Sequence, residues 1–151
     1  MTAAEFPDAL ADALAGVQRL IRRRLRGGLT VPRLRGAQVE LLQLVAARPG
    51  IRVSAAAKEL YLAGNSVSTL VNQLVRDGYL LRETDPDDRR SALLQITPAA
   101  RTRLRDWKSR RDALVREQVA QLDAADRAAL EAALPALRRL AQNLHEEAEG
   151  T

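Results

Sequence analysis

Residues 65–97 read NSVSTLVNQLVRDGYLLRETDPDDRRSALLQIT, and the fold class follows mainly from their pattern. In its first part the apolar residues recur at spacings of three and four, which is the period of one helix face. These residues are Val67, Leu70, Val71 and Leu74. After Gly78 two extended runs, residues 79–84 and 91–96, flank Asp85-Pro86, and Asp-Pro is a turn initiator. The stretch therefore predicts a helix over 65–77 followed by a β-hairpin.

A second short helix is expected immediately before this one. Ser54 is a suitable N-cap for a helix that reaches Tyr61, after a short extended piece at 51–53. Residues 62–64 read Leu-Ala-Gly, which predicts a tight turn into the next helix. Two short helices joined by a tight turn can place the second in the major groove of DNA.

Longer helices are expected on both sides. An amphipathic stripe predicts a helix over residues 5–26 that ends at Gly27-Gly28, and 36–47 predicts another with Val39, Leu42 and Val45 inward. On the C-terminal side, Thr97-Pro98 is a favoured helix start, and that helix continues to about Gln121. Asp123 is expected to cap the last helix, in which Pro135 predicts a kink.

The fold class that follows is mainly α with a small β-hairpin wing. We expect a winged helix–turn–helix protein whose N- and C-terminal helices form a dimerisation region. A chain of 151 residues has the size of one domain, so residues 1–151 are assigned to one. Within it, 36–97 form the winged helix–turn–helix, 97–121 the connecting helix, and 1–34 and 122–151 the dimerisation helices.

The composition narrows the classes of function. The net charge is +5, and Lys58 and Lys108 are the only lysines, so the positive charge is almost all arginine. Arginine suits phosphates and guanine edges, which favours nucleic acid, although a coding bias toward Arg and Ala would give the same composition. With no cysteine and one histidine, His145, we expect no metal and no cofactor. No apolar run approaches the ~20 residues of a membrane span and no signal-peptide pattern opens the chain. We expect a soluble, cytoplasmic protein with no membrane partner.

The polar face of the 65–77 helix is the first candidate site. Short polar side chains cover it, and asparagine or glutamine can pair with adenine while serine and threonine bond bases or phosphates. The expected contacts are Asn65, Ser66, Ser68, Thr69, Asn72, Gln73 and Arg76. The alternative is an ordinary surface helix, but such faces favour Glu and Lys, which are better helix formers. Because this face carries serine, threonine and asparagine, which are weaker helix formers, we favour a role in DNA recognition.

The hairpin is the second candidate site. It carries Arg82, Arg89 and Arg90, and an arginine at the tip can enter a narrow minor groove. Three aspartates accompany them and would repel DNA unless they pair with the arginines or turn inward to hold the loop. They are Asp85, Asp87 and Asp88. The alternative is a turn that neutralises its own charge, and the hairpin alone does not decide between the two.

Helix and hairpin together resemble those of the MarR-type transcriptional regulators. The wing of that family resembles Asp-x-Arg-x-x-x-Leu-x-Leu-Thr, and residues 88–97 match it with Ile96 for the second Leu. Residues 66–80 look like its recognition helix. The resemblance implies a homodimer on a pseudo-palindromic operator, with Arg90 as the wing arginine and Asp88 as the aspartate that positions it.

The chain departs from the family pattern at two places. Thr69 stands where many members have arginine, so base preference cannot be carried over. The 36–47 helix begins with Arg35-Gly36 where a Thr-Pro type of start is common, so its cap is expected to be weaker.

The apolar stripes of the terminal helices predict a dimer interface. They are too apolar to leave in water, and pairing across a two-fold axis would bury them, although packing within the chain accounts for part. The expected dimerisation residues are Phe6, Leu10, Leu14, Val17, Ile21, Leu137 and Leu144.

The function expected from these observations is a sequence-specific, DNA-binding transcriptional regulator acting as a ligand-responsive repressor on double-stranded DNA. The resemblance implies a small aromatic or anionic effector, but no residue singles out its pocket. The alternative is an architectural DNA-binding protein without sequence preference. An enzyme is disfavoured because the sequence shows no motif that joins His145 to a nucleophile and no glycine-rich phosphate loop. A helical adaptor would leave the arginine-tipped hairpin unexplained.

Overall fold

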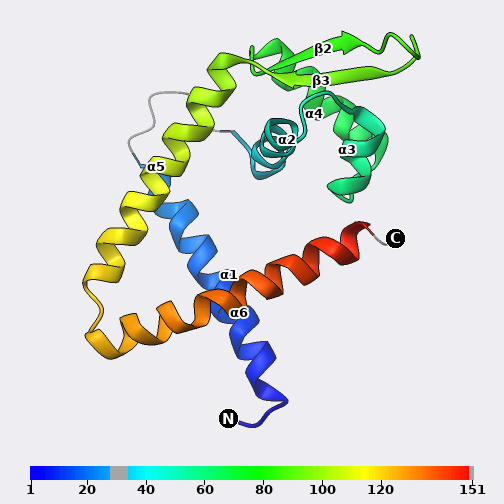
Figure 1. Ribbon diagram of the computed structural model, residues 1–151. Coiled ribbons are helices and arrows are strands. Elements are labelled where there is room, and N and C mark those ends of the chain that lie inside the picture. The colour runs from blue at the N-terminus through cyan, green and yellow to red at the C-terminus, as the bar shows by residue number, and fades with distance from the viewer. Residues whose placement is uncertain (28–33, 150–151) are drawn as a thin grey trace. The chain divides into compact units, whose positions relative to one another are not determined.

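The computed structural model describes residues 1–27 and 34–149, and the protein is mainly helical (Figure 1). The helices are α1 (Glu5–Leu25), α2 (Gly36–Ala47), α3 (Val53–Glu59), α4 (Gly64–Arg76), α5 (Pro98–Ala120) and α6 (Ala124–Glu149). The strands are β1 (Ile51–Arg52), β2 (Leu80–Thr84) and β3 (Ala92–Ile96). The predicted mainly α class with a β-hairpin is confirmed, with helix ends within about two residues of those expected. Gly28 and the rest of 28–33 lie outside the described residues.

The small sheet is antiparallel with the strand order β1-β3-β2. Leu80 pairs with Ile96 and Thr84 with Ala92, so the hairpin closes around the Asp-Pro turn as expected. The extended piece expected at 51–53 is an edge strand of two residues, in which Ile51 pairs with Leu94. Alternate residues of β3 are buried, which fixes one face of the sheet against the helices.

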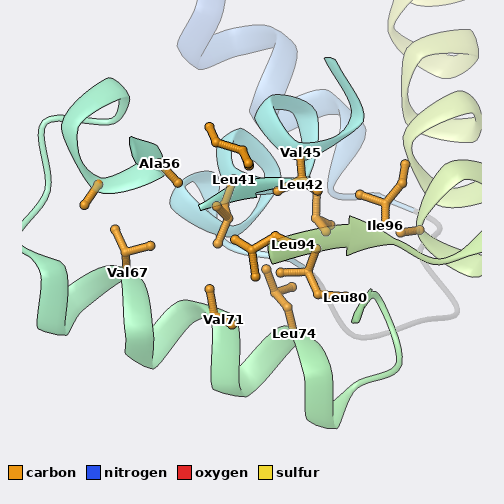
Figure 2. Close-up of a cluster of buried hydrophobic side chains, with 13 residues drawn as sticks. Leu41, Leu42, Val45, Ala56, Val67, Val71, Leu74, Leu80, Leu94 and Ile96 are labelled. Carbon is orange, nitrogen blue, oxygen red and sulfur yellow. The ribbon is translucent and has the colours of Figure 1, made fainter. Parts of the chain in front are cut away.

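One hydrophobic core joins α2, α3, α4 and the sheet (Figure 2). Val67, Val71 and Leu74 project from α4 into this core and are essentially inaccessible to solvent. They meet Leu41, Leu42 and Val45 of α2 and Leu80 and Leu94 of the sheet. Because α4 uses its apolar stripe here, its polar side is left facing outward. The prediction for α2 was incomplete, since Val39 is half-buried whereas Leu41 and Gln38 are buried.

The predicted N-cap at Ser54 is wrong. Helix α3 begins at Val53 and Arg52 occupies the N-cap position with extended dihedral angles. The reason is tertiary: Arg52 is held in β1 by its pairing with Leu93, so the chain enters the helix as soon as that pairing ends. The helix also ends earlier than expected, and Tyr61 follows it with a positive φ of 53°.

The other predicted helix starts are confirmed. Thr97 Oγ1 accepts a hydrogen bond from Ala100 N at 3.2 Å, and Asp123 Oδ1 accepts one from Asp126 N at 2.8 Å. Helix α2 has more support than Arg35-Gly36 suggested, because Gln38 Oε1 accepts a hydrogen bond from Arg35 N at 2.9 Å. Helix α6 continues through Pro135, and the kink stays a prediction.

The chain divides into two compact units, residues 1–33 with 108–122 and residues 34–107 with 123–151. In the first, Arg110 donates hydrogen bonds to the carbonyl oxygens of Leu25, at 3.1 Å, and Gly27, at 2.9 Å. The Arg110 guanidinium thus donates to carbonyl oxygens that lack a hydrogen-bond partner within the helix at its C-terminus. The second unit contains α2, α3, α4 and the three strands, so it holds both candidate sites. The assignment of residues 1–151 to one domain stays a prediction.

No helix within residues 1–27 and 34–149 is both long enough and apolar enough to cross a bilayer.

Candidate nucleic-acid interface

The outward face of α4 carries the polar residues that the sequence singled out. Six of them are exposed: Asn65, Ser66, Ser68, Thr69, Asn72 and Arg76. Gln73 is half-buried, because it lies at the edge of the face nearest α2. The Thr69 hydroxyl donates to the carbonyl oxygen of Asn65 at 3.0 Å, so its remaining capacity toward a ligand is as an acceptor.

Two amide side chains of this face are held by partners within the chain. Arg82 Nη2, from β2, donates a hydrogen bond to Asn72 Oδ1. Gln38 Nε2, from α2, donates to Gln73 Oε1 at 3.3 Å. The sequence predicted Asn72, Gln73 and Arg82 as three independent DNA contacts. The structure instead ties Arg82 to Asn72 and turns Gln73 toward α2.

The tip of the hairpin presents Arg89 and Arg90, both exposed. Asp88 folds the turn beneath them, because its carboxylate accepts hydrogen bonds from Arg90 N at 3.0 Å and Ser91 Oγ at 3.1 Å. This local geometry orients the backbone of Arg90 and is independent of its guanidinium, which stays exposed. The roles of Asp88 and Arg90 toward DNA stay predictions.

A buried carboxylate anchors the base of the hairpin. Asp85 is 3% exposed, and its Oδ2 receives Arg52 Nη2 at 2.5 Å in a salt bridge. Its Oδ1 accepts a hydrogen bond from Asp87 N at 2.9 Å. Asp85 therefore turns inward and holds the loop, which is one of the two alternatives considered for the aspartates. Its partner is an arginine of β1 and not one of the hairpin arginines.

Arg52 was not among the predicted site residues, and no local signal in the sequence identifies it. Arg52 and Asp85 are 33 residues apart, and the register of β1 on β3 brings them together. A lone arginine in an extended piece has many possible partners until that register is known. The neighbouring pair of Arg48 and Glu59, at 2.5 Å, lies between α2 and α3 and is more exposed.

The terminal helices leave apolar side chains uncovered. Of the seven predicted dimerisation residues, Phe6, Leu14, Val17 and Leu144 are exposed, while Leu10, Ile21 and Leu137 are half-buried. Leu130 and Leu134 of the predicted C-terminal stripe are exposed as well, and so are Leu20 and Leu140, which were not predicted. Exposed apolar residues repeated along a helix are unusual in a monomer and are typical of an interface.

Residues 1–27 and 34–149 contain no cluster of three or more potential metal-ligating side chains.

Comparison with known sequences points to one family. Residues 28–91 match the sequence profile of the MarR family. A protein of Thauera aromatica, named "Putative transcriptional regulatory protein for hcr operon", is 40% identical over 58 residues. These residues cover 38% of this chain and 35% of that protein, so the match spans about a third of the relative's length.

Solved structures are similar over nearly the whole chain. The transcriptional regulator Tm0710 of Thermotoga maritima is 25% identical with a TM-score of 0.69, covering 95% of this chain and 98% of its own. FabT of Streptococcus pneumoniae, solved in complex with DNA, is 22% identical with a TM-score of 0.70, covering 95% and 99%. These likenesses show that the chain shares the fold of these proteins over the terminal helices as well as over the winged helix–turn–helix.

Proposed function

Because the chain belongs to the MarR family of transcriptional regulators, we propose that it is a sequence-specific repressor that binds a pseudo-palindromic operator as a homodimer. The observation that carries the proposal is the exposed polar face of α4, held on the same buried core as a hairpin with exposed tip arginines. A rigid core matters because base readout requires side chains held at fixed positions in the groove. A family of transcription regulators also gives no reason to expect enzymatic activity.

Helix α4 would enter the major groove. Its exposed residues are short and contain hydroxyl and amide groups, which reach base edges while the helix backbone stays close to the groove floor. Arg76, at the last residue of the helix, is suited to a phosphate. The contacts of the individual residues are part of the proposal.

The hairpin would place an arginine in the adjacent minor groove. Arg90 is the best single candidate, because Asp88 fixes its backbone while leaving its guanidinium exposed. A guanidinium gains from the enhanced negative potential of a narrow minor groove. Asp85 does not oppose this contact, since it is buried and already paired with Arg52.

The homodimer is supported by the uncovered apolar residues of α1 and α6. Two copies related by a two-fold axis would bury these faces and present two α4 helices to two half-sites. Such a regulator would act in the cytoplasm. Release by a small aromatic or anionic effector stays part of the proposal, without assigned residues.

The test is competitive binding between a DNA fragment from the promoter of its own gene and random DNA, followed by fluorescence anisotropy at increasing salt. We expect the promoter fragment to stay bound at salt concentrations that release random DNA. Equal affinity for both would support the architectural alternative, and binding to neither would refute a role on DNA.

Substitution of Arg90 measures how much the hairpin contributes to DNA binding. Arg90→Ala is expected to weaken binding to the promoter fragment on the order of tenfold, with the dimer intact by sedimentation. Arg116→Ala, in the exposed part of α5, removes the same charge outside both candidate sites and is the matched control. Equal losses in the two variants would show that general charge, and not the hairpin contact, is responsible.

A further inference from the structure

The contact between Asn72 and Arg82 changes the chemistry that α4 offers to a base. Asn72 is exposed on α4, Arg82 is exposed on β2, and the guanidinium donates to the amide oxygen. Two side chains predicted to act separately therefore form one unit across the junction of helix and hairpin. The inference that follows rests on the proposed function, because it concerns which base this unit reads.

The orientation of the Asn72 amide is determined by its partner. A guanidinium carries five N–H donors and no acceptor, so the amide atom that faces it must be the oxygen. The Nδ2 group of Asn72 is then directed away from Arg82 and carries two N–H donors. The exposed surface of the pair therefore consists of amide and guanidinium donors, with the positive charge next to the single acceptor atom.

This donor surface does not fit adenine. The usual asparagine–adenine pair needs the amide oxygen to accept from N6–H and the amide nitrogen to donate to N7. At Asn72 the oxygen is engaged by a cation, which also repels a second approaching N–H group. Cytosine is unsuitable for the same reason, because its N4 amino group is a donor in the major groove.

Guanine has the complementary pattern. It presents two adjacent acceptors, N7 and O6, in the major groove. The amide nitrogen of Asn72 and a second N–H of Arg82 supply two donors from one side. We propose that Asn72 and Arg82 act together as a donor-only reader that selects guanine over adenine at one position in each half-site.

The side-chain amide of Gln73, which follows Asn72 on α4, is oriented in the same way, with its oxygen directed toward a partner within the chain. Gln38 Oε1 accepts from Arg35 N at 2.9 Å, which directs Gln38 Nε2 toward Gln73 and requires Gln73 to present its oxygen. Gln73 is left with amide donors, as Asn72 is. Both amide oxygens of this part of α4 already accept a hydrogen bond within the chain, which disfavours the adenine amino group that the sequence alone had suggested as their partner.

The test first locates the base pair that Asn72 reads. Duplexes are selected from a random library with the full-length protein and with Asn72→Ala, and the position whose preference is lost in the variant marks the contact. Wild-type affinity is then measured for the selected duplex, for the three base-pair variants at that position, and for a duplex carrying 7-deazaguanine there. We expect guanine to be favoured over adenine by on the order of tenfold, and loss of the N7 acceptor to weaken binding severalfold.

Arg82→Ala is the decisive variant. Freeing the Asn72 oxygen is expected to bring adenine to at least parity with guanine at that position. In the Asn72→Ala background, the further change Arg82→Ala is expected not to raise the relative affinity for adenine, because no Asn72 oxygen is left to be freed. Arg116→Ala, which removes an equal charge, is expected to keep the wild-type preference.

Two results would overturn the proposal. One is adenine preferred by the wild-type protein at the position that Asn72 reads. The other is a uniform loss of affinity for all duplexes in Arg82→Ala with a smaller salt dependence, which would make Arg82 a phosphate contact. Failure of the wild-type protein to enrich any sequence would instead refute the proposed function itself, so the two failures are distinguishable.

Discussion

Removing Arg52 tests whether the buried carboxylate of Asp85 depends on its salt bridge. The Asp85 side chain is 4% exposed and that of Arg52 is 49% exposed. Truncating one member of a fully buried pair costs about 3–5 kcal/mol, because the remaining charge is left without a partner. Here the arginine is half in solvent and Asp85 keeps the hydrogen bond from Asp87 N, so we expect Arg52→Ala to cost about 1–3 kcal/mol.

The assay is urea unfolding followed by circular dichroism at a fixed protein concentration, since the stability of the proposed dimer would depend on concentration. Arg48→Ala is the matched control, because its salt bridge has the same 2.5 Å length but both partners are more exposed, at 52% and 16%. We expect it to cost no more than about 1 kcal/mol. Asp85→Asn removes the buried charge and keeps an acceptor for Asp87 N, so Arg52→Ala should cost little in that background.

Two outcomes would refute this reasoning. One is a cost for Arg52→Ala no larger than that of Arg48→Ala. The other is an equal cost for Arg52→Ala in the wild-type and Asp85→Asn backgrounds, which would assign its effect to something other than the ion pair.

Three further predictions concern single residues outside the proposed DNA contacts. Tyr61→Gly should stabilise the protein by about 0.5–1 kcal/mol in the same unfolding assay, because Tyr61 is exposed with a φ of 53° that glycine adopts without strain. A loss of stability would mean that the Tyr61 side chain makes stabilising contacts. Gly78→Ala should destabilise by about 1 kcal/mol, since Gly78 has a φ of 81° with open space around its Cβ position, and an unchanged stability would contradict the argument. Hydrogen bonds from Lys108 and Arg111 lower the pKa of Asp112, so NMR titration should show its pKa below the ordinary value and a rise in Lys108→Met. The stability gained from this ionised carboxylate is present above its unfolded pKa and is lost as the pH falls through the folded pKa, and an unchanged pKa in the variant would exclude Lys108 as the cause.

Features set by local chemistry could be predicted from the sequence. The stripe of α4 follows from helical periodicity, the hairpin from the Asp-Pro turn, and the starts of α5 and α6 from the caps Thr97 and Asp123. Each depends on residues within a few positions of one another. The exposed polar face of α4 followed as well, because an apolar face turned inward leaves the opposite face in solvent.

Features set by long-range pairing could not be predicted. The start of α3 depends on β1 pairing with β3, which outweighs the preference of Ser54 for a cap. The partners Gln38 with Gln73, Asn72 with Arg82, and Arg52 with Asp85 are 35, 10 and 33 residues apart. Until the register and the packing of α2 on α4 are known, each of these side chains has many candidate partners. The candidate site therefore lies on the predicted elements, α4 and the hairpin, but the hydrogen-bonding groups that its side chains offer differ from those expected.

Sequence-specific binding by a symmetric dimer is tested by selecting bound duplexes from a random library with the full-length protein. We predict one enriched sequence with two-fold symmetry, whose half-sites are centred about one helical turn of DNA apart or a multiple of it. Enrichment of a single unsymmetrical half-site would contradict the dimer, and the absence of any enriched sequence would contradict sequence-specific recognition by α4 and the hairpin.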